Sequence, residues 1–159
     1  MPTAETLSNQ LIALTKRLKL SPDRVRLKPF AGRAYKFYLL LPRKRRGQDV
    51  FTERDAAYLT QHLNALFGGL TTNDVTKSPV IGLYEVQEVA DRIGTDVDLH
   101  RSFTVYTKPI VACRNYFIEL EEFLREYLLK TRGIQEELLM IEMSTVEIIN
   151  YQLRRTIPR

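Results

Sequence analysis

Apolar and polar residues recur with two different periods along this chain, and the changes between them predict its helices and strands. Leucines return every three or four residues between Thr3 and Leu20, and similar spacings occupy residues 52–67 and 111–131. These stretches are predicted to be amphipathic helices. Shorter β-prone runs predict four strands. They lie at Tyr35–Leu41, Val80–Val86, Asp98–Lys108 and Gln135–Ile149.

The run Tyr35–Leu41 is apolar at both odd and even positions, which favours an interior strand, and Pro42 is expected to end it. Residues 24–33, 43–49 and 71–78 are then predicted to be a connector, a polar turn and a loop. Thr52 and Asp55 have the spacing of a helix-capping pair. Glycines at 68 and 133 are expected to end the two long helices.

The predicted order over residues 34–150 is strand–helix–strand–strand–helix–strand. This is the α+β, ferredoxin-like βαββαβ pattern, with an antiparallel sheet in the order 4-1-3-2 and two helices on one face. Residues 1–33 add a basic helix and connector, and residues 151–159 a basic tail. The other sheet face would carry Tyr38, Leu40 and Met140. An apolar face needs a cover, for which the N-terminal helix, a second copy of the chain or a ligand are the alternatives.

Two local stretches bear on family resemblance. Arg101-Ser102-Phe103-Thr104-Val105-Tyr106 matches the strand pattern of RNA-recognition-motif domains at Arg101 and Phe103, and lacks its glycines and central aromatic residue. The helix end Leu66-Phe67-Gly68-Gly69-Leu70-Thr71 resembles small bacterial ferredoxin-like proteins, and the element order is similar to that of ACT and PII-like regulatory domains. This resemblance implies an architecture, and because the fold hosts many unrelated functions it implies no single activity.

Composition favours an ordinary cytoplasmic protein. The 159 residues are 44% hydrophobic and 27% charged, enough for one domain with its own core. The longest apolar runs fall far short of the roughly 20 residues that cross a bilayer, so no membrane partner is expected. The first residues lack the pattern of a secretory signal. Cys113 is the single cysteine, which excludes an internal disulfide or a cysteine-built zinc site.

Positive charge is concentrated in the first third of the chain. Residues 1–46 hold twelve Lys and Arg against two acids, whereas residues 47–159 hold twelve against seventeen. This imbalance indicates an anionic partner, either nucleic acid or an acidic protein. The alternative is that the basic segment packs over the acidic remainder of the same or a neighbouring chain. The candidate anion-binding residues are Arg43, Lys44, Arg45, Arg46, Lys16, Arg17, Lys19, Arg24, Arg26 and Lys28.

Signatures of catalysis are missing from the sequence. It contains no phosphate-binding glycine loop, no His-Glu-x-x-His and no Gly-x-Ser-x-Gly. Cys113 falls in the first turn of a predicted helix, where a thiol can be activated, although a small buried side chain is the simpler interpretation. Asp96, Asp98 and His100 would share one strand face and could bind a metal, or could form a solvated hairpin end. We therefore assign no catalytic residue, metal or cofactor.

A second group of polar residues is predicted on the open face of the sheet. Lys36 and Glu142 could form a cross-strand ion pair or belong to a pocket. The pocket residues would be Lys36, Tyr38, His100, Tyr106 and Glu142. The leading hypothesis is a non-catalytic binding module that self-associates through the open sheet face and whose basic N-terminal third contacts nucleic acid or an acidic protein. The alternatives are a small-molecule-binding regulatory domain or small enzyme that uses this pocket, and a structural subunit of an oligomer.

Overall fold

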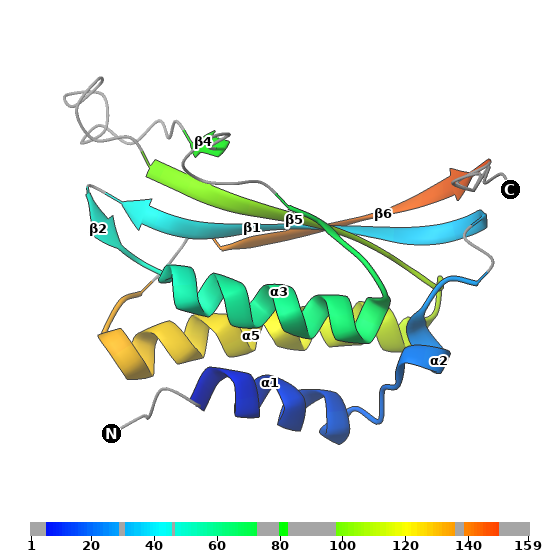
Figure 1. The fold of residues 1–159 in the computed structure, drawn as a ribbon, viewed down its shortest axis with the longest axis horizontal. Helices are drawn as coiled ribbons and strands as arrows, with labels where there is room; N and C mark the ends of the chain where they lie inside the picture. Colours follow the sequence, from blue (N-terminus) through cyan, green and yellow to red (C-terminus); the bar gives the residue numbers. More distant parts are fainter. Residues whose placement is uncertain are drawn as a thin grey trace, which may run out of the picture.

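The computed structural model describes residues 6–28, 31–45, 47–72, 80–82, 98–135 and 139–149. They form an α+β structure in which helices cover one face of a curled, antiparallel sheet (Figure 1). The α+β class and the antiparallel sheet are confirmed. In the described part of the chain, no helix is both long enough and apolar enough to cross a membrane.

Strand β1 (Gly32–Arg45) lies in the interior of the sheet, as its apolar composition predicted. It pairs with β6 (Met140–Ile148) along one edge and with β5 (Asp98–Thr107) along the other. Phe37, for example, stands opposite Met143 on β6 and Val105 on β5. The far edge of β5 pairs with two short strands, β3 (Thr71–Thr72) and β4 (Val80–Gly82).

Pro42 does not end β1, so the predicted strand boundary and the polar turn at 43–49 were wrong. The pairing of β1 with β6 stops at Leu40, and the pairing with β5 shifts register between Pro42 and Lys44. A proline lacks an N–H donor and is tolerated at such an irregularity. The strand continues to Arg45, which pairs with Gln48 of β2 (Gln48–Asp49).

Two long helices, α3 (Glu53–Phe67) and α5 (Val111–Arg132), cover one face of the sheet (Figure 1). Thr52 and Asp55 form the predicted capping box at the start of α3. The helices end at Gly68 and Gly133, both in the left-handed conformation, which confirms the predicted stops. The predicted loop at 71–78 instead begins with β3. Residues 73–79 and 83–97 lie outside the described ranges.

The N-terminal helix α1 (Thr6–Arg17) packs beneath α3 and α5, on the side away from the sheet (Figure 1). Its leucines at 7, 11 and 14 are buried in the same hydrophobic cluster as Phe37 and Phe117. The helix therefore does not cover the open sheet face, which was one of the expected possibilities. A short helix, α2 (Pro22–Val25), follows where only an irregular connector was predicted.

Candidate functional site

The predicted anion-binding residues divide into two groups at opposite ends of β1. Residues 43–45 lie beside β2, whereas α2 and the end of α1 lie near the start of β1 (Figure 1). A strand of 14 residues spans roughly 45 Å. One short polyanion segment therefore cannot contact both groups at once. We call the group beside β2 the hairpin end and the group around α1 and α2 the helical end.

At the hairpin end, Arg43 is directed into the protein. Its side chain is 5% exposed, and its guanidinium donates to the Phe51 carbonyl and to Glu53, with an Nη2–Oε1 distance of 2.9 Å. Glu53 also accepts from Arg101 at 3.2 Å. Lys44 lies 3.8 Å from the Asp49 carboxylate and Arg45 is half-buried, while Arg46 lies outside the described residues. The cations at this end mainly hold β1, β2 and α3 together.

At the helical end, cations converge from three separate segments. Arg24 donates to the Lys19 carbonyl at 2.9 Å, and the Lys108 ammonium donates to the Asp23 carbonyl at 3.0 Å. The backbone N–H of Lys108 also donates to the Val25 carbonyl at 3.0 Å. These bonds hold the end of α1, α2 and the segment after β5 against one another, so that their charges gather on one surface.

Further cations surround this contact. Lys16, Lys19 and Lys28 are exposed. Arg17 forms an ion pair with Glu119 of α5, and Arg26 donates to the Ala65 carbonyl at 2.7 Å. These two side chains thus contribute to packing as well as to charge.

Two members of the helical end were missed by the sequence analysis. Lys108 follows β5, and Arg114 is exposed in the first turn of α5. Both are far in sequence from the basic N-terminal third. Only the antiparallel pairing of Tyr35 with Thr107 brings the end of β5 to the start of β1. No local signal in the sequence predicts that placement.

The predicted open-face pocket is only partly assembled. Lys36, Tyr38 and Glu142 line a shallow cavity of about 280 Å³ together with Met143 and Ser144. Tyr106 stands directly opposite Lys36. His100 pairs with Pro42 instead, is buried, and lies six residues along β5 from Tyr106, which is roughly 20 Å. The described residues show no ion pair between Lys36 and Glu142.

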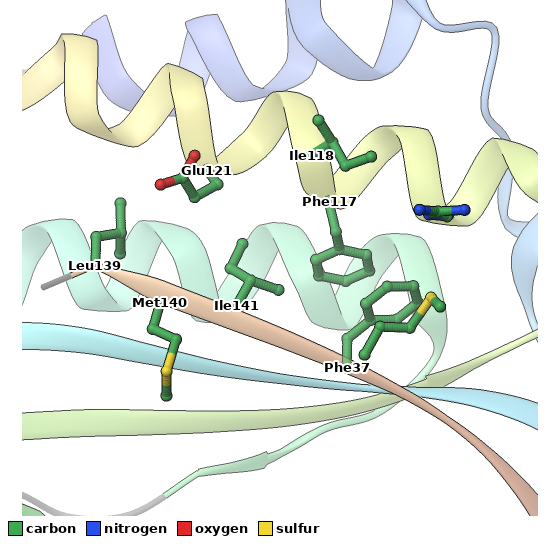
Figure 2. Close-up of a pocket in the computed structure, with 9 residues that line it drawn as sticks. Phe37, Phe117, Ile118, Glu121, Leu139, Met140 and Ile141 are labelled. Atoms are coloured by element: carbon green, nitrogen blue, oxygen red, sulfur yellow. The ribbon is translucent and has the colours of Figure 1, made fainter.

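A larger apolar groove, which the sequence did not predict, lies between β6 and α5 (Figure 2). Its volume is about 450 Å³, and the rings of Phe37 and Phe117 stack in its floor with centroids 4.0 Å apart. Ile118 and Glu121 reach it from α5, and Ile141 reaches it from β6. Arg114 also lines it and so connects the groove with the helical end.

Burial shifts the pKa values of two further reactive residues, Cys113 and His62. Cys113 is buried, and burial raises the pKa of its thiol. His62 Nε2 lies 2.6 Å from the Tyr116 hydroxyl between the helices, and burial lowers the pKa of its imidazole to about 4. Asp96 and the side chain of Asp98 lie outside the described positions. Among the side chains that are described, no three His, Cys, Asp or Glu residues form a metal-binding group.

Comparison with known proteins adds no assignment, because no protein-family model, curated protein or solved structure matches this chain.

Proposed function

We propose that the protein is a non-catalytic binding module that contacts nucleic acid through its helical end. The observation that carries this proposal is the gathering of Lys19, Arg24 and Lys108 from three segments onto one surface. Asp23 is the only acidic residue described in segments 6–28 and 108–114, and Glu119 of α5 is paired with Arg17. The remaining cations leave this surface positive, and such surfaces attract phosphates.

Nucleic acid is favoured over an acidic protein because partly exposed aromatic rings lie on the two strands whose ends meet the helical end. Lys108 directly follows β5, where Tyr106 stands opposite Lys36 on the open sheet face. Tyr38 lies two residues further along β1 on that face, and both tyrosines are partly exposed. A strand that contacts the helical end with its phosphates and passes around the start of β1 to the open face could stack its bases on these rings.

The scaffold that we propose for this module is ferredoxin-like. The pairing of β1 with both β6 and β5, and of β5 with β3 and β4, supports the order 4-1-3-2. The two helices on one face support the same assignment. Such a sheet leaves its second face free for a ligand, which is the face that carries Lys36, Tyr38 and Tyr106.

The test is binding of single- and double-stranded DNA and RNA at about 50 and 200 mM salt, with two triple variants. Lys16→Gln, Lys19→Gln and Lys28→Gln remove three exposed charges at the helical end. Each phosphate contact contributes about 0.7 to the slope of log affinity against log salt for a single strand. The variant should therefore lower this slope by about 2. Raising the salt from about 50 to 200 mM should then weaken its binding by a factor roughly 15 times smaller than for the native chain.

The matched control removes three charges from elsewhere on the surface. Lys44→Gln, Arg54→Gln and Lys130→Gln change the net charge equally, and should leave the slope nearly unchanged. Equal effects of the two triple variants would assign the attraction to net charge alone and refute a localised surface. Displacement of the nucleic acid by polyglutamate at equal charge concentration would instead indicate an acidic protein partner. Absence of binding at 50 mM salt would leave the Lys36–Tyr38–Glu142 cavity, and hence a small-molecule ligand, as the better candidate.

A further inference from the structure

Strand β6 forms an edge of the sheet in the part of the chain that the structure describes. It pairs there with β1 alone, in a continuous register from Leu40–Met140 to Gly32–Ile148. Most of its residues are exposed. Among the described residues, nothing pairs with its outer edge, which runs for nine residues.

This edge carries few of the features that normally prevent pairing with another chain. Protective edges carry charged residues, above all lysine, or proline or a bulge. The sequence Met-Ile-Glu-Met-Ser-Thr-Val-Glu-Ile contains two acids but neither lysine nor proline, and the register shows no bulge. Met143 is 41% exposed on it, and Ile118 of α5 is 49% exposed nearby, where both line the apolar groove. A weakly protected edge beside exposed apolar side chains favours addition of a strand.

We infer that the added strand is β6 of a second copy, antiparallel to the first and related to it by a two-fold axis at Ser144. In an antiparallel strand pair, side chains that stand opposite each other lie on the same face of the sheet. A two-fold axis normal to the sheet keeps every side chain on its own face, so the residue on the axis must stand opposite its own copy. Ser144 is the midpoint of Met140–Ile148. It is therefore the centre of the one register that pairs all nine residues.

The sequence of β6 complements itself in this register. Glu142 stands opposite Val146 of the second copy, and Glu147 stands opposite Ile141, so that no two acids face one another. Like charges directly opposite destabilise a strand pair. The two Met143 side chains become diagonal neighbours on the groove side of the sheet. The copies thereby cover each other's exposed methionine and the mouths of both grooves.

The two-fold register can be tested by cross-linking at its centre. Opposite residues of antiparallel strands have Cβ atoms roughly 4.5–5.5 Å apart, close to the span of a disulfide. Under a mild oxidant such as diamide, the Ser144→Cys variant should form a covalent dimer. Glu142→Cys is the matched control, because its two copies would lie four residues, or about 14 Å, apart. We expect at least tenfold slower cross-linking for the control. The native Cys113 is buried, and the unmodified chain serves as the blank.

A second experiment separates assembly from folding. Met143 and Thr145 stand opposite each other across the proposed axis, so Met143→Lys combined with Thr145→Lys places ammonium groups face to face. Both positions are exposed in the single chain. This variant should sediment as a monomer with an unchanged circular dichroism spectrum, whereas the native chain should sediment as a dimer. A native chain that remains monomeric at about 100 μM, or equal cross-linking rates for the two cysteine variants, would overturn the inference.

Discussion

Acidification should destabilise this protein through one histidine between its helices. Nε2 of His62 on α3 lies within hydrogen-bond distance of the Tyr116 hydroxyl of α5, at 2.6 Å, and of the Thr15 hydroxyl of α1, at 3.3 Å. Protonation of His62 would place a charge in this contact, where burial already lowers the imidazole pKa to about 4.

The sign and size of the effect follow from the two protonation states. Unfolded, the imidazole titrates near 6.5; folded, it titrates near 4. Above pH 6.5 it is neutral in both states and contributes nothing to the pH dependence. As the pH falls below 6.5 the unfolded chain takes up the proton first, so the free energy of unfolding decreases. The loss amounts to about 2 kcal/mol at pH 5 and approaches about 3.4 kcal/mol below pH 4.

The assay is urea unfolding at pH 7.5 and pH 5.0 for the native chain and for His62→Gln. Glutamine keeps a side-chain acceptor for Tyr116 but cannot be protonated in this range. Carboxylates and His100 contribute equally to both proteins, so that the difference between the two pH dependences isolates His62. We expect the native chain to lose about 2 kcal/mol more than the variant. Equal losses would refute the assigned role of burial in this pKa.

Two further predictions concern folding stability, each measured as the change in the free energy of unfolding in urea. Thr52→Ala removes the hydroxyl that accepts from the Asp55 N–H at 3.1 Å and should cost about 1 kcal/mol of stability. Thr72→Ala on the exposed strand β3 is the control and should change the stability by nearly zero. If Thr52→Ala also has no effect, the capping box does not stabilise the protein. Leu11→Ala leaves a cavity at a fully buried position on α1 and should cost roughly 2–5 kcal/mol of stability, with unfolding still a single transition. Ala13→Gly on the exposed side of α1 is the control and should cost about 1 kcal/mol. If Leu11→Ala has no effect, α1 is not part of the cooperative core.

Elements whose signals are local were predicted well from the sequence. The capping residues Thr52 and Asp55, the stop at Gly68 and the apolar stripe of α5 each lie within a few residues of what they specify. The end of β1 was missed because the effect of Pro42 depends on its neighbours in the sheet, where one pairing has stopped and the other shifts register. The apolar stripe of α1 likewise predicted which face is buried but not which surface would cover it.

The candidate site was harder to predict, because a run of cations does not specify where each one points. Phe37, Leu39 and Leu41 face the helices, whereas Leu41, Pro42 and Arg43 are buried in succession at the register shift. The burial of Arg43 against Glu53 therefore depends on this irregularity, which the sequence pattern did not predict. Lys108 could not have been found either, because its neighbours at the helical end lie more than 80 residues away in sequence.

The interior position of β1 also has a consequence for synthesis of the chain. Its two long pairing partners are made much later than the short β2, since β5 begins at Asp98 and β6 ends at Ile148, 103 residues after Arg45. At about 5–20 residues per second, the ribosome needs roughly 5–20 s to complete both. During that interval the apolar run from Phe37 to Leu41 has no sheet to enter. The cations that follow it at 43–46 are placed as gatekeepers that oppose aggregation, a role that would end once Arg43 becomes buried against Glu53.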